Sequence, residues 1–398
     1  MLTTSQIIVN TLKKCRVKQI FGTPGTSEIP FLSALEEDGS IKYITAYLDG
    51  LAVGMADGYA RSSGNVGIAN LHATQGTLNA IGFIRVALRD HSPIVVISGL
   101  PSHSYELVEP NHFVYGLTDI LRRVTKWSWQ VNSKDQVAWA LERAIKISLT
   151  PPYGPTFVGI PQDIQVEKTN NIDYPLHNSN FLKIHTDNNE LNNVAKEILK
   201  AKNPVIFAGR KLGISKSQKE LSDIADKLGI LVISEAPDRG PQVYTVNLPS
   251  NHPYYLGYYS NTDDVIKSVI SKSDIIIDIG CKTTYKRVVA EINIQKTKII
   301  QIDDDPLHLG KYYAPQYGIY GDIKSNLNSL LKCLLNNSVR YKEEIDRRKK
   351  EYQLLTKKHR KIITKEVESI EFTGNKISPI QLVKAMQKSL PDGCCIYR

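Results

Sequence analysis

Short, unbroken apolar runs that alternate with helical patterns constrain this chain of 398 residues more than any other feature. Residues 1–170 contain four such runs, found within KQIFGTPG, VGIANLH, SPIVVISGL and PTFVGIP. A strand that is apolar on both sides is typical of a parallel sheet that helices cover on both faces. We therefore predict an α/β fold for this part of the chain.

The same pattern returns after a polar, loop-like segment at residues 166–180. Residues 185–335 contain the runs PVIFA, ILVIS, DIIIDIG and KIIQID, with an amphipathic helix that ends at Gly229. The pattern predicts two doubly wound parallel-sheet domains, at 1–170 and 185–335. A charged helix at 336–375 follows, and 376–398 reads as the truncated start of a third α/β domain. Because a single strand cannot bury its own faces, we expect the remainder to be missing or to belong to another polypeptide.

Composition narrows the class of protein. The chain is 41% hydrophobic and 23% charged, which is ordinary for a globular protein. The N-terminus lacks the layout of a signal peptide, and no apolar run is long enough to cross a bilayer. Five scattered cysteines without a C-x-x-C pair argue against a disulfide scaffold and against a zinc site. We expect a cytoplasmic protein that does not bind a membrane.

The net charge of +10 raises the question of nucleic-acid binding. Residues 340–366 alone contain 11 lysines and arginines against 5 acidic residues. That stretch has the composition of a solvated helix, and the remaining charge forms no basic patch with interleaved aromatic residues. We therefore expect no nucleic-acid partner.

One predicted helix has an unusual composition. In LDGLAVGMADGYA, Leu48 to Ala60, glycine recurs every fourth residue, although each glycine costs a helix interior about 1 kcal/mol relative to alanine. Residues at this spacing share one face of a helix, so another surface must come close to that face. Asp49 lies at the head of the helix.

Two further motifs follow predicted strands. FGTPGTSEIPF, residues 21–31, places a glycine turn and the hydroxyls of Thr26 and Ser27 ahead of Glu28. NLHATQGTLNAIG, residues 70–82, places His72 at the end of a strand and a Gly-Thr pair after it. In open parallel sheets, ligands bind beyond the carboxyl ends of the strands. Both motifs are therefore candidates for a ligand site.

Taken together, these motifs and DHSPIVVISG resemble, in order and interval, the pyrimidine-binding domain of thiamine-diphosphate-dependent enzymes. The superfamily is that of pyruvate decarboxylase and acetolactate synthase, and residues 185–335 resemble its central domain. Within it, FGTPGTSEIPFL, NLHATQGTLNAIG and HSP look most like benzoylformate decarboxylase. The resemblance implies decarboxylation of a small 2-oxo acid, in which thiamine diphosphate accepts the electrons released as carbon dioxide leaves.

The resemblance also assigns residues. His72 would handle protons, Thr26 would orient the substrate carboxylate, and His252 in NHPYYLG would be a second substrate-site histidine or a packing residue. A carboxylate at the head of the glycine helix would hydrogen-bond the aminopyrimidine ring at a dimer interface. The residues expected to contact the cofactor are Pro24, Gly25, Asp49, Gly76, Thr77 and Asn79.

The chain departs from the family pattern at two points. The family's glutamate is replaced by Asp49, which is about 1.5 Å shorter in reach. Either the helix lies closer to the cofactor, or the cofactor is used slowly or differently, or activity is lost and the fold kept.

The second departure concerns the diphosphate. The Gly-Asp-Gly motif that holds diphosphate and Mg²⁺ in the family's third domain is absent from this sequence. We expect weak or no binding of thiamine diphosphate by these residues alone, and no FAD in the central domain. We expect a homodimer or tetramer, or a partner chain that supplies the diphosphate-binding domain. The alternatives to a decarboxylase are an acetolactate-synthase-type carboligase and a non-catalytic interaction or regulatory subunit.

Overall fold

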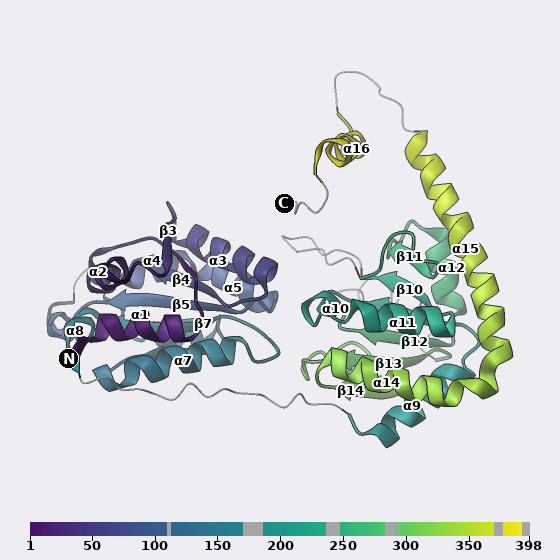
Figure 1. The fold of residues 1–398 in the computed structure, drawn as a ribbon, viewed down its shortest axis with the longest axis horizontal. Coiled ribbons are helices and arrows are strands. Elements are labelled where there is room, and N and C mark those ends of the chain that lie inside the picture. The colour runs from purple at the N-terminus through teal and green to yellow at the C-terminus, as the bar shows by residue number, and fades with distance from the viewer. Residues whose placement is uncertain are drawn as a thin grey trace. The chain divides into compact units, whose positions relative to one another are not determined.

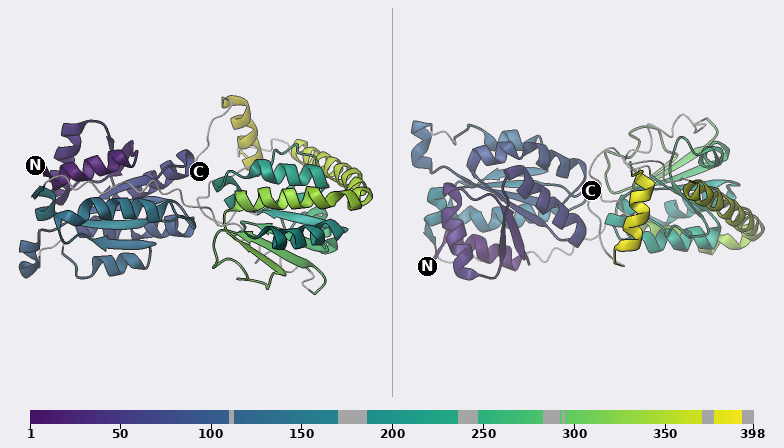
Figure 2. Two further views of the ribbon diagram at one scale, coloured as in Figure 1. Left: turned by 60° about the horizontal axis from the view of Figure 1, so that its bottom comes forward. Right: turned by 90° about the horizontal axis from the view of Figure 1, so that it is seen from above.

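The structure is a computed structural model that describes residues 1–109, 113–169, 186–235, 247–282, 292, 295–369 and 377–391. The chain divides into two compact units, Met1–Phe181 (unit 1) and Leu182–Arg398 (unit 2) (Figure 1). Each unit contains one six-stranded parallel sheet with helices on both faces (Figure 2). The predicted α/β fold with two doubly wound parallel sheets is confirmed. The strand expected in the last residues lies outside the described residues.

Unit 1 has the strand order β3-β2-β4-β5-β7-β6, and every pairing in this sheet is parallel. The central strands β4 and β5 are buried along their whole length, because helices cover them on both faces. The strands are β2 (Gln19–Gly22), β3 (Lys42–Thr45), β4 (Gly67–Leu71), β5 (Ile94–Leu100), β6 (Trp127–Gln130) and β7 (Thr156–Pro161).

Successive residues of each strand in unit 1 enter two different apolar cores. Ile68 packs with helices α1 (Thr4–Lys14), α2 (Ile29–Asp38) and α7 (Val137–Ser148). Its neighbour Ala69 packs on the opposite face, with α3 (Asp49–Ser63), α5 (Ile81–Arg89) and α6 (Leu117–Arg122). This alternation follows from the two-residue period of a strand. The remaining elements are α4 (Ala73–Asn79), α8 (Gln162–Val166) and the antiparallel pair β1 (Leu2–Thr3) and β8 (Lys168–Thr169).

Unit 2 repeats this architecture with the order β11-β10-β9-β12-β13-β14. Its strands are β9 (Pro204–Ala208), β10 (Leu231–Ser234), β11 (Tyr255–Tyr258), β12 (Ile275–Ile279), β13 (Lys298–Asp303) and β14 (Tyr317–Tyr320). Its helices are α9 (Asn188–Lys200), α10 (Lys211–Ile214), α11 (Gln218–Leu228), α12 (Asp264–Lys272), α14 (Ile323–Asn337), α15 (Lys342–Glu368) and α16 (Pro379–Ser389). As predicted, α11 ends at Gly229, which has φ +60° and so favours glycine.

The charged helix at 336–375 is present as α15, but one side of it is buried in unit 2 rather than solvated. Arg348 Nη1 donates to the Ala201 carbonyl at 3.0 Å, and Thr356 donates to the Pro253 carbonyl at 2.6 Å. The buried side of this helix is mostly polar, so the sequence shows no apolar stripe to mark it. Among the described residues, no helix combines the length and apolar character needed to cross a bilayer.

Candidate functional site

The carboxyl ends of neighbouring parallel strands bring the predicted site residues of unit 1 to one edge of its sheet. The turn after β2 contains a short 3₁₀ helix, η1 (Thr26–Glu28). Asp49 begins α3 shortly after β3, and His72 lies between β4 and α4. Since these three strands are adjacent and parallel, their following loops lie side by side.

The glycine face of α3 is approached by another helix of the same chain. A Cβ atom at Gly50 would lie 2.5 Å from the ring of Phe83 on α5, and one at Gly54 would lie 3.5 Å from it. At Gly58, by contrast, no atom of the described residues lies within 4 Å of such a Cβ position. The close approach expected from a neighbouring subunit is thus made, at the first two glycines, by Phe83 within the chain. Only Gly58 keeps an open face.

Asp49 is brought together with two residues of α4. Its Oδ2 atom lies 3.4 Å from Asn79 Nδ2, and a Cβ atom at Gly76 would lie 2.5 Å from Asp49 Oδ1. Oδ1 is buried and accepts no hydrogen bond from the described residues. The fourth predicted residue of this group, Thr77, uses its hydroxyl inside α4, where it donates to the Ala73 carbonyl at 2.8 Å. The arrangement therefore leaves one acceptor atom of Asp49 for a ligand.

His72 lies against a buried acid that the sequence interpretation did not select. Glu28 is only 1% exposed, and its Oε2 atom lies 3.5 Å from His72 Nδ1. Glu28 Oε1 accepts from the Gly99 amide at 2.9 Å and from the Ala73 amide at 3.1 Å. Burial raises the pKa of Glu28 to about 7, although these amides act in the opposite direction. The available sequence signal was an acidic residue at a strand–helix junction just before the apolar IPFL.

Glycine makes this contact possible. A Cβ atom at Gly25 would lie 1.6 Å from His72 Nδ1, and one at Gly99 would lie 2.4 Å from Glu28 Oε1. Gly25 therefore lies against the predicted histidine, and its contact with a cofactor stays a prediction. Pro24 and Thr26 are exposed on the same turn, and the Thr26 carbonyl accepts from Gln162 Nε2 at 3.1 Å.

His252 belongs to unit 2. Its Nδ1 accepts from the Tyr254 amide at 3.3 Å, and its Nε2 lies 3.2 Å from Ser222 Oγ and 3.3 Å from Asp226 Oδ1. The side chain is 8% exposed. These contacts fit packing, the second of the two roles that the sequence left open, and a substrate role stays a prediction.

The carboxyl edge of the sheet in unit 2 is built differently. Lys211 Nζ, in a side chain that is 3% exposed, lies 2.6 Å from Asp303 Oδ1 and 2.6 Å from Asp304 Oδ1. Burial alone would lower the pKa of Lys211, but the two carboxylates raise it above its ordinary value. The ammonium group of Lys211, which follows strand β9, is thus held by two carboxylates.

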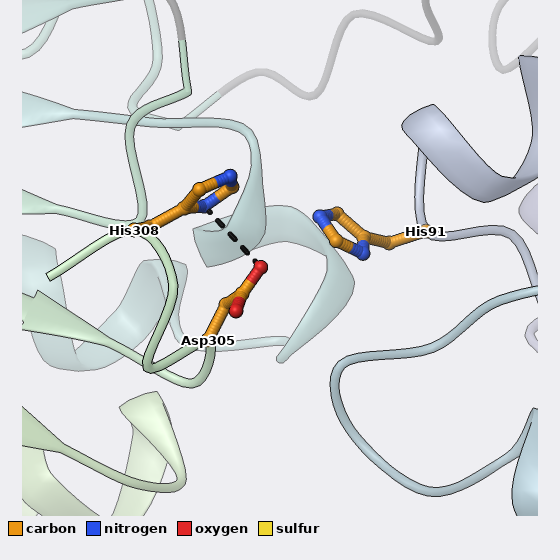
Figure 3. A group of neighbouring side chains, drawn as sticks. All are labelled: His91, Asp305 and His308. Carbon is orange, nitrogen blue, oxygen red and sulfur yellow. Dashed lines mark ion pairs between the residues drawn. The ribbon is translucent and has the colours of Figure 1, made fainter. Parts of the chain in front are cut away.

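Close to this pair, His308 Nδ1 lies 3.7 Å from Asp305 Oδ2 (Figure 3). Burial and the charge of Lys211 lower the pKa of His308 to about 4, so the imidazole is neutral at pH 7. His91, also drawn in Figure 3, belongs to unit 1.

A hollow beside His308 in unit 2 is lined by Asp278, Gln301 and Tyr313 among others. Asp278 Oδ2 accepts from Gln301 Nε2 at 3.3 Å and from the Tyr313 hydroxyl. Burial raises the pKa of Asp278. The expectation that this unit does not take FAD stays a prediction.

Comparisons with known proteins agree with the motifs. The thiamine pyrophosphate enzyme family matches twice, through its N-terminal TPP-binding domain at residues 2–122 and its central domain at residues 191–330. The acetolactate synthase large subunit of Buchnera aphidicola subsp. Schizaphis graminum is 25% identical over 97% of this chain. That of Haemophilus influenzae is 27% identical over 87% of it. The chain spans 66% and 60% of the length of these two relatives.

Solved structures show the same fold. The crystal structure of benzoylformate decarboxylase from Polynucleobacter necessarius matches 84% of this chain and 61% of its own, with a TM-score of 0.72 and 23% identity. At this identity the likeness concerns the fold alone. The resemblance to the superfamily, predicted from the motifs, is confirmed.

Proposed function

We propose that this chain, which belongs to the thiamine pyrophosphate enzyme family, forms the pyrimidine-binding side of an active site that decarboxylates a small 2-oxo acid. The observation that carries the proposal is the buried, unpartnered Oδ1 atom of Asp49 beside Gly76 and Asn79. A buried acceptor without a donor costs free energy, so a site that keeps one is ready for a ligand that donates.

The residues present fit thiamine diphosphate. When bound, this cofactor supplies an electron sink for the pair of electrons that a departing carbon dioxide leaves behind. Asp49 Oδ1 would accept a hydrogen bond from a protonated nitrogen of the aminopyrimidine ring. Gly76 would lie against that ring, where a side chain would intrude, and Asn79 would orient the Asp49 carboxylate from its other oxygen.

The close packing of α3 and α4 supports a working role for the shorter acid. An aspartate reaches about 1.5 Å less far than a glutamate. Here the carboxylate already lies so close to α4 that Gly76 has no room for a Cβ atom. This favours the first of the three interpretations of Asp49, in which the helix comes nearer and the aspartate does the work of the glutamate.

The remaining roles follow from position at the same edge. His72, whose side chain is 24% exposed, would give or take a proton at the oxygen of the 2-oxo group. Thr26 is exposed on the turn after β2 and would orient the substrate carboxylate. Pro24 and Gly25 lie in the same turn and would contact the cofactor.

Carboligation of the acetolactate synthase type is the second candidate. The two curated relatives described above are acetolactate synthase large subunits, which favours this activity on sequence. Both reactions begin with loss of carbon dioxide from a 2-oxo acid, so the roles of Asp49, His72 and Thr26 are common to them. Product analysis separates the two: an aldehyde marks the decarboxylase, and a 2-hydroxy-2-alkyl-3-oxo acid marks the carboligase.

Mg²⁺ and the diphosphate would be held outside these two units, by a diphosphate-binding domain of another region or chain. The sequence Tyr320-Gly321-Asp322 does not supply this site, because Asp322 caps α14 and its Oδ1 accepts from the Ser325 amide at 2.8 Å. Tyr47, Leu48 and Leu51 are exposed by 95%, 69% and 45% close to Asp49. Exposed apolar side chains next to a site that lacks its diphosphate-binding part support an interface here with a second copy or with a partner chain.

Binding of the aminopyrimidine tests the proposal directly. Millimolar thiamine diphosphate with Mg²⁺, added to the isotope-labelled chain, is expected to shift the amide resonances of Gly76 and Asn79. In Asp49→Ala the affinity is expected to fall at least tenfold, which is about 1.4 kcal/mol, and in Asp49→Glu to be largely kept. Asp57→Ala removes another acid from α3, one paired with Arg61 at 2.7 Å, and is the matched control.

Equal affinity of the wild type and of Asp49→Ala for the cofactor would contradict the proposal and would favour the non-catalytic interaction subunit.

A further inference from the structure

The carboxyl group of Glu28 is held in one orientation by the backbone. The Ala73 and Gly99 amides both donate to Oε1, from the start of α4 and from β5. Oε2 accepts no hydrogen bond from the described residues and lies 3.5 Å from His72 Nδ1. One oxygen is therefore fixed, and the other is directed at the imidazole.

Glu28 is a buried acid without a lysine or arginine partner in the described part of the chain. Its one basic neighbour there is His72. The other titratable groups around the pair are Tyr43 on β3 and Asp49 at the head of α3. Burial first, and then the charge of Glu28, raise the pKa of Tyr43, so that its hydroxyl stays neutral. Burial likewise raises the pKa of Glu28 to about 7, so the carboxyl can hold a proton at neutral pH.

The contact is built so that no other side chain can enter it. Gly25 and Gly99 leave no space for a Cβ atom next to His72 Nδ1 and next to Glu28 Oε1. A separation of 3.5 Å is longer than a hydrogen bond, but catalytic hydrogen bonds are often long before the substrate is bound. A shift of a few tenths of an ångström would close it.

We infer that Glu28 is a positioning residue for His72 and supplies a proton to it, acting at Nδ1 of the imidazole ring. The inference rests on the proposed function of His72. In the resting site the Glu28 carboxyl donates to Nδ1, so the neutral imidazole carries its proton on Nε2. As negative charge builds on the oxygen of the 2-oxo group, the Nε2–H bond breaks and an O–H bond forms there.

The Glu28 proton passes to Nδ1 in the same step. The imidazole thus ends neutral with its proton on the other nitrogen, and Glu28 ends as a carboxylate that accepts from Nδ1. One proton has moved from Glu28 to the substrate oxygen, and no net charge remains on the ring. The tautomer of His72 therefore reports the protonation state of Glu28.

That link gives a test in the full chain without cofactor. Nitrogen-15 spectra of the histidine rings, with His72 assigned by its loss in His72→Phe, are recorded between pH 5.5 and 8.5. We expect His72 to change from the Nε2–H to the Nδ1–H tautomer as Glu28 ionises. In Glu28→Gln the amide oxygen can keep both backbone hydrogen bonds while the amide nitrogen donates to Nδ1, so the switch is expected to be lost and Nε2–H to persist.

Glu36→Gln removes an exposed carboxylate of α2 and is the control in which the switch is retained. A switch that survives in Glu28→Gln, or a wild type that holds one tautomer throughout, would overturn the inference. Tryptophan fluorescence verifies that unit 1 stays folded in each variant, because all three tryptophans lie in it. No cofactor enters this experiment, so its failure is distinct from a failure of the Asp49 binding test.

Discussion

The two units share one architecture but differ in how a pair of acids at the carboxyl edge of the sheet is partnered. In unit 1, Glu28 and Asp49 each keep an oxygen without a hydrogen-bond donor from the described residues. In unit 2, Asp303 and Asp304 close on the buried ammonium of Lys211 at 2.6 Å. A buried charge is tolerated when it is paired, and an unpaired acid stays neutral or awaits a ligand.

This difference indicates a division of labour between units of the same fold. The edge that carries His72 keeps acids with unused acceptor atoms, which is a property of chemical sites. At the edge that carries Lys211, the ammonium group pairs with Asp303 and Asp304, whereas Asp278 on β12 keeps an oxygen without a donor from the described residues. Variants at the two edges test the contrast between the units.

Removal of Lys211 would give unit 2 unpaired acids like those of unit 1. In Lys211→Met we expect the free energy of unfolding of unit 2 to fall by about 3–5 kcal/mol, because two buried carboxylates lose their cation. Urea unfolding followed by hydrogen exchange in the strands of unit 2 measures the loss, while the tryptophan signal of unit 1 stays unchanged. Asp303→Asn in the Lys211→Met background is expected to restore part of the stability. Full stability of the single variant would break the contrast.

The close contacts at the two edges also differ in whether the atoms that face the glycine can move. A Cβ atom at Gly209 in unit 2 would lie 2.1 Å from the backbone carbonyl oxygen of Gly280, whereas one at Gly25 meets the side chain of His72. We expect Gly209→Ala to destabilise unit 2 by about 3 kcal/mol and Gly25→Ala to destabilise unit 1 by about 1 kcal/mol, since a ring can rotate and a strand end cannot. Thermal unfolding of both variants gives the comparison, and the reverse order would contradict it.

The uncompensated acid of unit 1 gives its stability a pH dependence. The pKa of Glu28 is raised to about 7 in the folded state, so the folded chain binds this proton more tightly than the unfolded chain. Its contribution to stability is fully present below the unfolded pKa near 4.5 and is lost as the pH rises through about 7. Relative to wild type, Glu28→Gln is expected to gain about 2 kcal/mol between pH 5 and pH 8.

Tryptophan fluorescence in urea at each pH measures this gain for unit 1. The matched control is Glu36→Gln, for which the difference from wild type is expected to be flat with pH. A flat difference for Glu28→Gln as well would mean that Glu28 is already ionised throughout this range.

The smallest effect concerns the open glycine of α3. Because no atom in the described part of the chain lies within 4 Å of a Cβ atom at Gly58, Gly58→Ala is expected to stabilise unit 1 by about 0.5–1 kcal/mol through helix propensity. Gly50→Ala, which collides with Phe83, is expected to destabilise it. If Gly58→Ala instead lowers stability in a concentration-dependent way, a second chain packs on this face of α3.

Much of the fold could be predicted, because its signals are local. Apolar runs such as Ile94–Leu100 read as buried strands whatever their neighbours, and Gly229 after an amphipathic helix marks an end. The burial of one side of α15 could not be predicted in this way. Its inward residues include Arg348 and Thr356, and only the carbonyl groups of other segments make their burial tolerable.

The same distinction between local signals and tertiary contacts applies to the candidate site. By itself the sequence determined that Asp49 heads a glycine-rich helix and that His72 ends a strand, because both facts depend on residues adjacent in the chain. Only the tertiary structure decided that Glu28 stands behind His72 and that Lys211 neutralises Asp303. These pairs are separated by 44 and 92 residues. Their interaction energies depend on burial and on the distance between the paired atoms to within a few tenths of an ångström. Burial and distance are set only when the strands are paired and the helices packed.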